Sequence, residues 1–185
     1  MKLDNQKIKD ILLRQNYVSS DDINKAEEVS KKGQSSLIEY LLEKGLITRN
    51  IFGQTVAESL GIAYADLSAN QPTRDQVLKI PEEVAKKYHA VVFREEEKSV
   101  IVATDSPSES GIFPELQQIF KSKQIILAYA LSDDISQSFV NYRQALETRF
   151  SKIISAQRRV APEIIGEILE DALAYRASDI HIEPQ

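Results

Sequence analysis

The stretch Leu37–Thr48, with the sequence LIEYLLEKGLIT, decides the fold of the amino-terminal part of the chain. Apolar residues stand at its first, fifth and sixth positions, among others, and this spacing places those three on one face of a helix. The stretch Ile8–Ser19, IKDILLRQNYVS, repeats the pattern, with a leucine pair at the same two positions. Two copies of one helix-turn-helix unit predict a small four-helix bundle over residues 1–60.

Each copy of the repeat carries its own turn and its own cap. Asn16 and Gly45 hold equivalent positions, and these residue types adopt most readily the left-handed conformation that ends a helix. Ser19 and Thr48 follow three residues later, where a side-chain oxygen can accept a hydrogen bond from the free N–H groups of the next helix. We therefore expect new helices to begin directly after Ser19 and Thr48.

After residue 60 the period of the apolar residues changes from that of a helix to that of short β-strands. Strands are expected over residues 62–67, 89–94, 99–104 and 124–131, the middle two joined in a hairpin by the charged residues 95–98. Helices are expected from Pro81 to Tyr88, through Leu116 and Phe120, and from Ser132 to about Leu146, the last two capped by residues 105–108 and 132–134. This order predicts an α+β fold, in which residues 61–146 form a small α/β sandwich with a mixed sheet and its helices on one face.

The last part of the chain reads as a linker and the start of a further domain. Residues 147–161 are rich in polar side chains and include Arg158 and Arg159, which we interpret as solvated. A helix is expected over residues 162–175. The run Ala177–Pro184, ASDIHIEP, alternates polar and apolar residues and predicts an opening strand. A lone strand leaves its backbone groups unpaired, so residues 162–185 are interpreted as an incomplete domain.

Composition excludes several classes of function. The formal net charge is -5 and the isoelectric point is about 5.2, which argues against broad binding to nucleic acids or anionic membranes. The chain has no cysteine, so disulfides and thiolate chemistry are excluded and a reducing cytoplasm fits. No apolar run approaches the roughly 20 residues of a membrane span, and no direct membrane insertion is expected.

The sequence lacks the residue patterns of catalysis. It contains neither the phosphate-binding pattern GxxxxGK[ST] nor GxGxxG. His89 has no acidic or histidine neighbour in sequence, so we expect a structural role. His181 alternates with Asp179 and Glu183, which would place all three on one strand face, and a solvated or interdomain face is preferred to a metal site. We therefore expect no catalytic residue, no metal and no cofactor within these residues.

At this point the chain resembles a known family. The run Ile164–Leu173, IIGEILEDAL, followed by Ala177–Pro184, looks like the start of the ATPase core of type II secretion and type IV pilus assembly ATPases. Upstream, Ile80-Pro81, Tyr88–Phe93 and Val102–Pro107 are similar to the amino-terminal domain of these bacterial enzymes.

The resemblance implies a homohexameric cytoplasmic motor whose Walker motifs, with ATP and Mg, lie beyond Gln185. It also implies that the residues before the core are a non-catalytic docking and regulatory module. Their partners would be the cytoplasmic domains of inner-membrane secretion or pilus assembly proteins, so that the motor lies peripherally at the inner membrane. The resemblance does not distinguish secretion, pilus extension and DNA uptake.

In part of this family the helical repeat binds cyclic di-GMP, through copies that begin Arg-Leu-Gly and carry glycine at the turn. Carried over to this sequence, the resemblance implies a degenerate site at Lys7, Leu12, Leu13, Asn16, Leu41, Leu42 and Gly45. Lys7 is the only basic substitute for arginine, and lysine forfeits the bidentate and stacking contacts of a guanidinium. Lys9 and Ile38 place side chains where the family has glycine. Three hypotheses stay open: a docking module, a cyclic di-GMP sensor and, least favoured, an independent enzyme.

Overall fold

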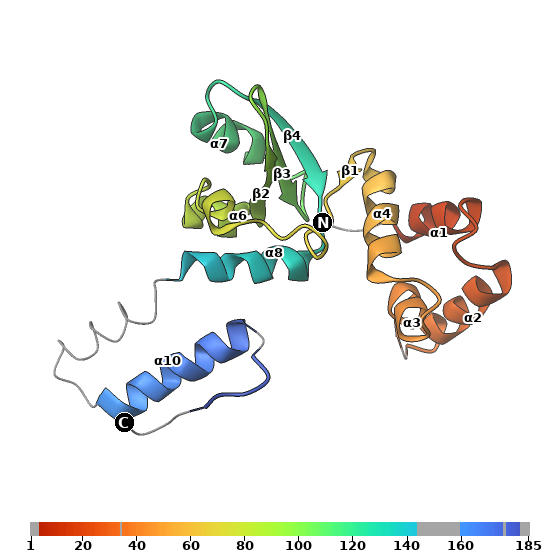
Figure 1. The fold of residues 1–185 in the computed structure, drawn as a ribbon. Helices are drawn as coiled ribbons and strands as arrows, with labels where there is room; N and C mark the ends of the chain where they lie inside the picture. The colour runs from red at the N-terminus through yellow and green to blue at the C-terminus, as the bar shows by residue number, and fades with distance from the viewer. Residues whose placement is uncertain (1–3, 34, 144–159, 176, 182–185) are drawn as a thin grey trace.

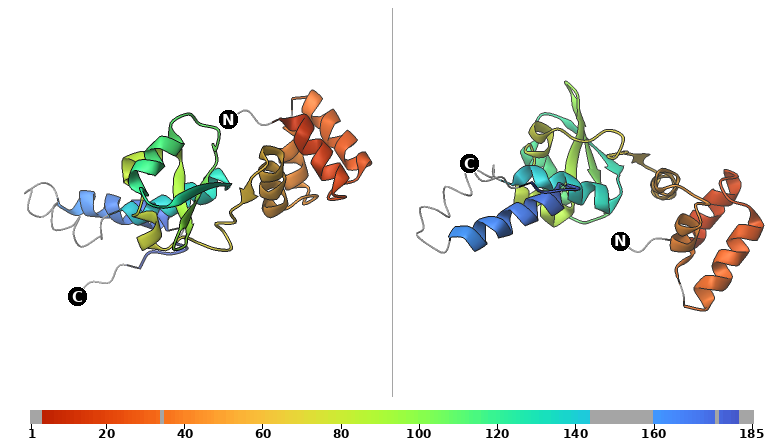
Figure 2. Two further views of the ribbon diagram at one scale, coloured as in Figure 1. Left: turned by 90° about the horizontal axis from the view of Figure 1, so that it is seen from above. Right: turned by 60° about the horizontal axis from the view of Figure 1, so that its bottom comes forward.

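The computed structural model describes residues 4–33, 35–143, 160–175 and 177–181. Figure 1 shows a group of four helices, a sheet flanked by helices, and one long helix near the carboxyl end. Two further views show that the four helices lie to one side of the sheet and that the long helix runs below it (Figure 2). The predicted α+β class is confirmed.

Residues 5–60 form the four helices that the repeat predicts: α1 Asn5–Arg14, α2 Ser20–Lys31, α3 Leu37–Glu43 and α4 Arg49–Leu60. The Ser19 hydroxyl accepts from the Asp22 N–H and the Thr48 hydroxyl accepts from the Ile51 N–H, so both predicted caps are confirmed. Asn16 has φ 55° and Gly45 has φ 65°, which confirms the two left-handed turns. Both turns are therefore built as the repeat requires.

The sheet has four strands in the order β1-β4-β3-β2: β1 Ala63–Tyr64, β2 Ala90–Glu95, β3 Ser99–Thr104 and β4 Gln124–Tyr129. The strands β2 and β3 pair antiparallel, as predicted for a hairpin, while β4 runs parallel to both β3 and β1. The pairing of β2 with β3 shifts register between Val92 and Arg94, which marks a bulge. The sheet is thus mixed, as expected.

Helices cover both faces of this sheet, so the expectation of helices on one face is wrong. These helices are α5 Arg74–Val77, α6 Glu82–Tyr88, α7 Ile112–Ile119 and α8 Ser132–Ser138, which continues into the 3-10 helix η1 Phe139–Tyr142. Val92 and Val102 pack in one buried cluster with α6 and α7. Val91 and Ala103, which point to the opposite side, pack in another cluster with α5 and α8. The strands are buried on both sides because each carries consecutive apolar residues rather than an alternation.

Two of the predicted caps differ from the structure. The helix α7 begins at Ile112, after Gly111 in a left-handed conformation, and no side chain caps it. The residue before α8 is Leu131, again without a side-chain cap, and the predicted cap residue Asp133 lies in the first turn instead. Gly111, with φ 101°, therefore stands where the helix begins, and the predicted cap residues 105–108 lie further upstream.

The bundle and the sheet share one buried contact. Tyr129 and Leu131, at the end of β4 and just after it, belong to the same apolar cluster as Leu12, Leu41 and Val56 of the bundle. Here Tyr64 of β1 lies against Gly53 of α4, where an added Cβ would stand 2.3 Å from the tyrosine ring. The bundle is therefore seated on the β1–β4 side of the sheet through α4.

The long helix α10 runs over Val160–Ala174, which agrees with the helix predicted from residue 162. Its side chains Ile165, Leu169 and Leu173 lie four residues apart and are 50%, 50% and 80% exposed. Residues 177–181 form no strand, contrary to the prediction for 177–184, since no neighbouring strand pairs with them. The rest of that run, and residues 147–159 of the predicted linker 147–161 with Arg158 and Arg159, lie outside the described residues, whereas residues 160 and 161 belong to α10.

Candidate functional site

The seven positions carried over from cyclic di-GMP binders lie in the core and turns of the bundle. Leu12 and Leu41 are fully buried in its apolar cluster, and Leu13 and Leu42 pack against it. Asn16 and Gly45 occupy the left-handed turns described above. These six positions thus have a structural role that any bundle of this kind would require.

Lys7, the seventh position, already has a partner within the bundle. Its Nζ donates to the backbone carbonyl oxygen of Ser59 at 2.8 Å, in the last turn of α4. A cation at the carboxyl end of a helix satisfies free carbonyl groups and interacts favourably with the helix dipole. A phosphate bound at Lys7 would therefore compete with this contact.

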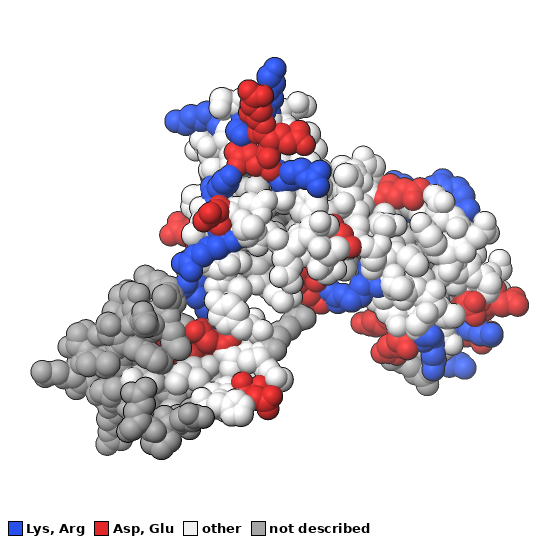
Figure 3. Space-filling model, in the orientation of Figure 1, with Lys and Arg blue, Asp and Glu red and all other residues white. Residues whose placement is uncertain are grey.

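Neighbouring basic side chains of the bundle are paired with acids. Lys9 Nζ lies 2.7 Å from Glu27 Oε1, and Arg14 lies 2.5 Å from Glu58. The hydrogen bond from Lys9, with its charge, holds the pKa of Glu27 below its usual value. Figure 3 shows Lys and Arg intermingled with Asp and Glu over the bundle and over the hairpin end, without a large basic patch on that face.

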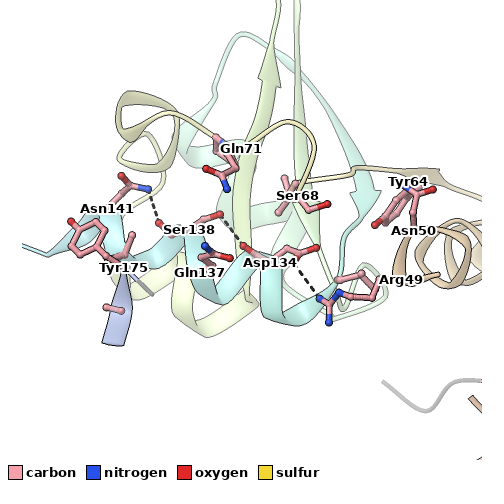
Figure 4. Close-up of a pocket in the computed structure, with 15 residues that line it drawn as sticks. Arg49, Asn50, Tyr64, Ser68, Gln71, Asp134, Gln137, Ser138, Asn141 and Tyr175 are labelled. Atoms are coloured by element: carbon pink, nitrogen blue, oxygen red, sulfur yellow. Dashed lines mark hydrogen bonds and ion pairs between the residues drawn. The ribbon is translucent and has the colours of Figure 1, made fainter. Parts of the chain in front are cut away.

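A cavity lies where the bundle, the sheet domain and α10 meet (Figure 4). Its volume is about 790 Å³, within the range of sites that hold a small molecule or a few residues of a peptide. Side chains from α4, from the segment after β1, from α8 and η1, and from the end of α10 line it, among them Arg49, Tyr64, Gln71, Gln137, Asn141 and Tyr175. We call it the junction pocket.

Arg49 is the cationic group in the described lining of the junction pocket, and two carboxylates hold it. Its guanidinium donates to Asp133 at 3.0 Å and to Asp134 at 3.2 Å, so that α4 of the bundle is tied to the start of α8. The hydrogen bond to Asp133 is the main cause that raises the pKa of Arg49. A guanidinium neutralised by two acids offers little to a phosphate group.

The remaining polar groups of the junction pocket are neutral. Asn50 donates to Asp66 at 2.5 Å, and Asn141 donates to the Ser138 carbonyl at 2.9 Å. Burial, followed by the nearby Asp66 carboxylate, raises the pKa of Tyr64 to about 12, so its phenol stays protonated at neutral pH. Amides and phenols of this kind can hydrogen-bond a neutral polar ligand or another polypeptide, but they supply no nucleophile with a base.

His89 lies in a cluster that the sequence did not reveal. Its Nδ1 lies 2.6 Å from Asp105 and its Nε2 lies 2.9 Å from the Ser136 hydroxyl, although these partners are 16 and 47 residues away. His89 therefore has an acidic neighbour in space, although it has none nearby in sequence. Burial alone would raise the pKa of Asp105, but the hydrogen bonds from His89 and Ser132 outweigh it and lower that pKa.

The order serine, histidine and aspartate is that of hydrolases with a nucleophilic serine. Here, however, Ser136 is exposed on α8 rather than set in a concave site, and the three side chains tie together the ends of α6 and β3 and the middle of α8. His89 also packs edge-on against Phe139, with ring centroids 5.4 Å apart. These contacts hold it in a left-handed conformation at φ 45°, and its role is the structural one that we expected.

The polar face expected at the carboxyl end lies only partly within the described residues. Asp179 and His181 are exposed and belong to no strand, and Glu183 lies outside the described residues. Across the part of the chain that the structure describes, no three acidic or histidine side chains are grouped to hold a metal ion. None of the described helices could cross a lipid bilayer.

Comparison with known proteins identifies the central part of the chain. Residues 60–149, from the end of α4 through the sheet and its helices, match the family model of the MshEN domain. Residues 60–149 are an MshEN domain. The resemblance to secretion and pilus assembly ATPases is thereby confirmed.

Relatives of this MshEN-containing chain are type IV pilus assembly ATPases. PilB of Myxococcus xanthus is 24% identical over 196 residues, which cover 95% of this chain and 35% of the relative. PilB of Thermus thermophilus is 20% identical over 173 residues, which cover 84% of this chain and 20% of the relative. The chain thus spans about a third or less of the length of these relatives.

The fold has also been seen in a solved structure of MshE with cdg. That structure has a TM-score of 0.51 and 20% sequence identity, and covers 74% of this chain and 98% of its own. At this identity the likeness concerns the fold alone. It agrees with the α+β arrangement described above.

Proposed function

We propose that these residues are a non-catalytic docking and regulatory module of a secretion or pilus assembly ATPase. The observation that carries the proposal is the match of the MshEN domain together with PilB relatives that align over nearly the whole chain. The partners would be cytoplasmic domains of inner-membrane assembly proteins, and the full protein would be a homohexamer in the cytoplasm, held at the inner membrane through those partners. ATP and Mg would bind only in the ATPase core, outside these residues.

The contacts of α8 support a role in transmitting a change in the position of the bundle toward the ATPase core. Arg49 ties the bundle to the first turn of α8, and Tyr142 in the following η1 donates to the carbonyl oxygens of Val77 and Ile80 at 2.8 and 2.7 Å. Arg143, directly after η1, donates to Asp171 of α10 at 2.9 Å. One continuous element therefore contacts the bundle, the rest of the MshEN domain and α10.

The exposed row of Ile165, Leu169 and Leu173 supports the interpretation of α10 as part of an ATPase core. Apolar residues four apart on an exposed helix face mark a contact that is completed by another surface. In the full protein, the remainder of the core would cover this row.

Binding to an inner-membrane partner tests the docking role. The 185-residue chain would be titrated calorimetrically with the cytoplasmic domain of an inner-membrane pilus assembly or secretion protein from the same organism. We expect saturable binding in the micromolar range, about 8 kcal/mol for a dissociation constant near 1 μM. No association with any such domain at high micromolar concentration would refute docking, whereas ATP turnover by these residues alone would refute the non-catalytic assignment.

A second candidate function is sensing of cyclic di-GMP, and the structure of MshE with cdg is the observation that favours it. The bundle keeps the apolar frame of the repeat, but Lys7 is held by Ser59 and the neighbouring cations are paired. Calorimetry and a thermal-shift assay with cyclic di-GMP test this candidate. Heat of binding that disappears in Lys7→Ala but persists in the matched surface variant Lys25→Ala would support sensing; no heat and no thermal shift would remove it.

A further inference from the structure

The two edges of the sheet differ in how well they are protected from pairing with another chain. At the β2 edge, the chain carries the bulge between Val92 and Arg94, and Gln76 of α5 donates to the backbone carbonyl of Phe93 at 3.2 Å. Bulges and covering side chains are the devices by which proteins prevent an edge strand from pairing with another chain. The β2 edge is thus protected.

The opposite edge is open over the first part of β4. The strand β1 pairs with β4 only at Ala128 and Tyr129, so among the described residues Gln124–Leu127 have register partners in β3 alone. Figure 1 shows the upper part of β4 extending beyond β1. The Gln124 N–H donates to Lys98 of the hairpin at 2.9 Å and therefore faces β3. Because backbone groups alternate along a strand, the N–H groups of Ile125 and Leu127 face the open side.

This open segment lacks the usual protection. Its sequence is QIIL, without a proline or a charged residue. Lys123, which directly precedes it, is turned toward β2, where its Nζ lies 2.8 Å from Glu95. The Ile126 side chain is 39% exposed at the segment's centre.

The face beside the open edge is apolar. Ile126 lies in register with Ile101 of β3, so the two side chains point to the same face, and Phe93 of β2 joins Ile101 as a partly buried residue on that face. An added strand would continue this row with one apolar side chain for every two residues. Four residues of β4 offer about 13 Å of edge, enough for a short strand of similar length.

We infer that the open edge of β4 at Gln124–Leu127 is a docking surface for an extended polypeptide segment with apolar residues at alternate positions. The segment would pair with β4 on the same side as β1 and in line with it. Main-chain hydrogen bonds to Ile125 and Leu127 would supply binding, and Ile126, at the outer end of the row that continues through Ile101 to Phe93, would contact the side chains of the added segment. The open edge continues the line along which β1 already pairs with β4, so an added segment would extend pairing of the same kind. The inference rests on the docking role proposed above and names the surface that performs it.

The test compares two matched variants of the 185-residue chain, with the partner cytoplasmic domain of the docking experiment as probe. Ile126→Lys places a charge on the open edge, where binding would bury it without a partner, and we expect affinity to fall about tenfold or more. Phe113→Lys makes the same change at another exposed apolar residue, on α7, and we expect affinity to stay within about twofold. Hydrogen exchange supplies the second measurement, with slowed exchange of the Ile125 and Leu127 amides expected in the complex.

The outcomes separate the two proposals. Undiminished binding by Ile126→Lys, together with unchanged exchange at Ile125 and Leu127, overturns the docking edge while the docking role stands. A wild-type chain that binds no such domain removes both. Loss of binding in Ile126→Lys alone, with protection of the two amides, supports the edge.

Discussion

Substitution of Gly53 by alanine tests how tightly the bundle is seated on the sheet. A Cβ at this position would stand 2.3, 2.4 and 2.6 Å from three atoms at the far end of the Tyr64 ring. Carbon atoms in favourable contact are about 3.5–4.0 Å apart, so the ring would have to move by about 1 Å or more. The Tyr64 backbone is fixed by its pairing with Tyr129. The Tyr64 side chain and α4 would therefore have to move to make room for the added Cβ.

Two opposing contributions determine how much Gly53→Ala changes the free energy of unfolding. Overpacking of a fitted contact costs about 1–3 kcal/mol. The exchange of glycine for alanine inside a helix returns about 0.8–1.0 kcal/mol. We therefore expect Gly53→Ala to lower the free energy of unfolding by up to about 2 kcal/mol in the wild-type background, and to raise it by up to about 1 kcal/mol when Tyr64 is already alanine.

A double-mutant cycle measures this difference. The four chains would be unfolded in urea and followed by far-ultraviolet circular dichroism, and a coupling energy of about 1–3 kcal/mol is expected between the two positions. Gly166→Ala is the matched control, because its added Cβ meets no atom within 4 Å. Equal effects of Gly53→Ala in both backgrounds, within about 0.5 kcal/mol, would refute the close packing of Tyr64 on α4.

Four further substitutions test the two turns, a buried hydroxyl and the histidine cluster. Gly45→Ala should cost about 1–2 kcal/mol of stability in urea unfolding, because φ is 65° there, whereas Asn16→Gly at the equivalent turn should change it by less than about 0.5 kcal/mol. Thr104→Val should cost about 1–3 kcal/mol by the same measurement, since the buried hydroxyl donates to the Tyr88 carbonyl at 3.0 Å; an unchanged midpoint would contradict that role. The folded pKa of Asp105 is lowered, so its stabilising effect is present above its ordinary value of 3.8 and is lost as pH falls below it. Unfolding of wild type and Asp105→Asn from pH 2 to pH 7 should therefore show a shallower acid loss in the variant, and parallel profiles would count against the pairing with His89.

The local elements of the fold could be predicted from sequence because their causes lie within a few residues. The cap Ser19 and the turn residue Gly45 act on the adjacent helix, and the hairpin follows from two apolar runs around four charged residues. The short helix α5 was missed although it also has a local cause. The Thr73 hydroxyl accepts from the Gln76 N–H and the Gln76 side chain accepts from the Thr73 N–H, a capping box that the pattern Thr-x-x-Gln announces.

The contacts between distant segments could not be predicted in this way. The partners of His89 are brought to it by the ends of other elements, and the junction pocket combines four separate segments. The helices on both faces did leave a signal, since the run Val91-Val92-Phe93 is apolar at every position. Unbroken apolar runs are typical of strands buried on both sides. The prediction that helices cover one face relied on the order of helices and strands along the chain and did not use this signal.

The arginine contacts on either side of α8 and η1 limit how strongly the bundle can influence α10. Asp134, one partner of Arg49, is only 12% exposed, but Arg49 is 56% and Asp133 is 69% exposed, and a pair as open as Arg49–Asp133 contributes about 0.2–1 kcal/mol. Breaking such a contact changes the ratio of two conformations by about fivefold at most. Loss of the Arg49–Asp133 pair alone would therefore grade the coupling between the bundle and α8 rather than switch it.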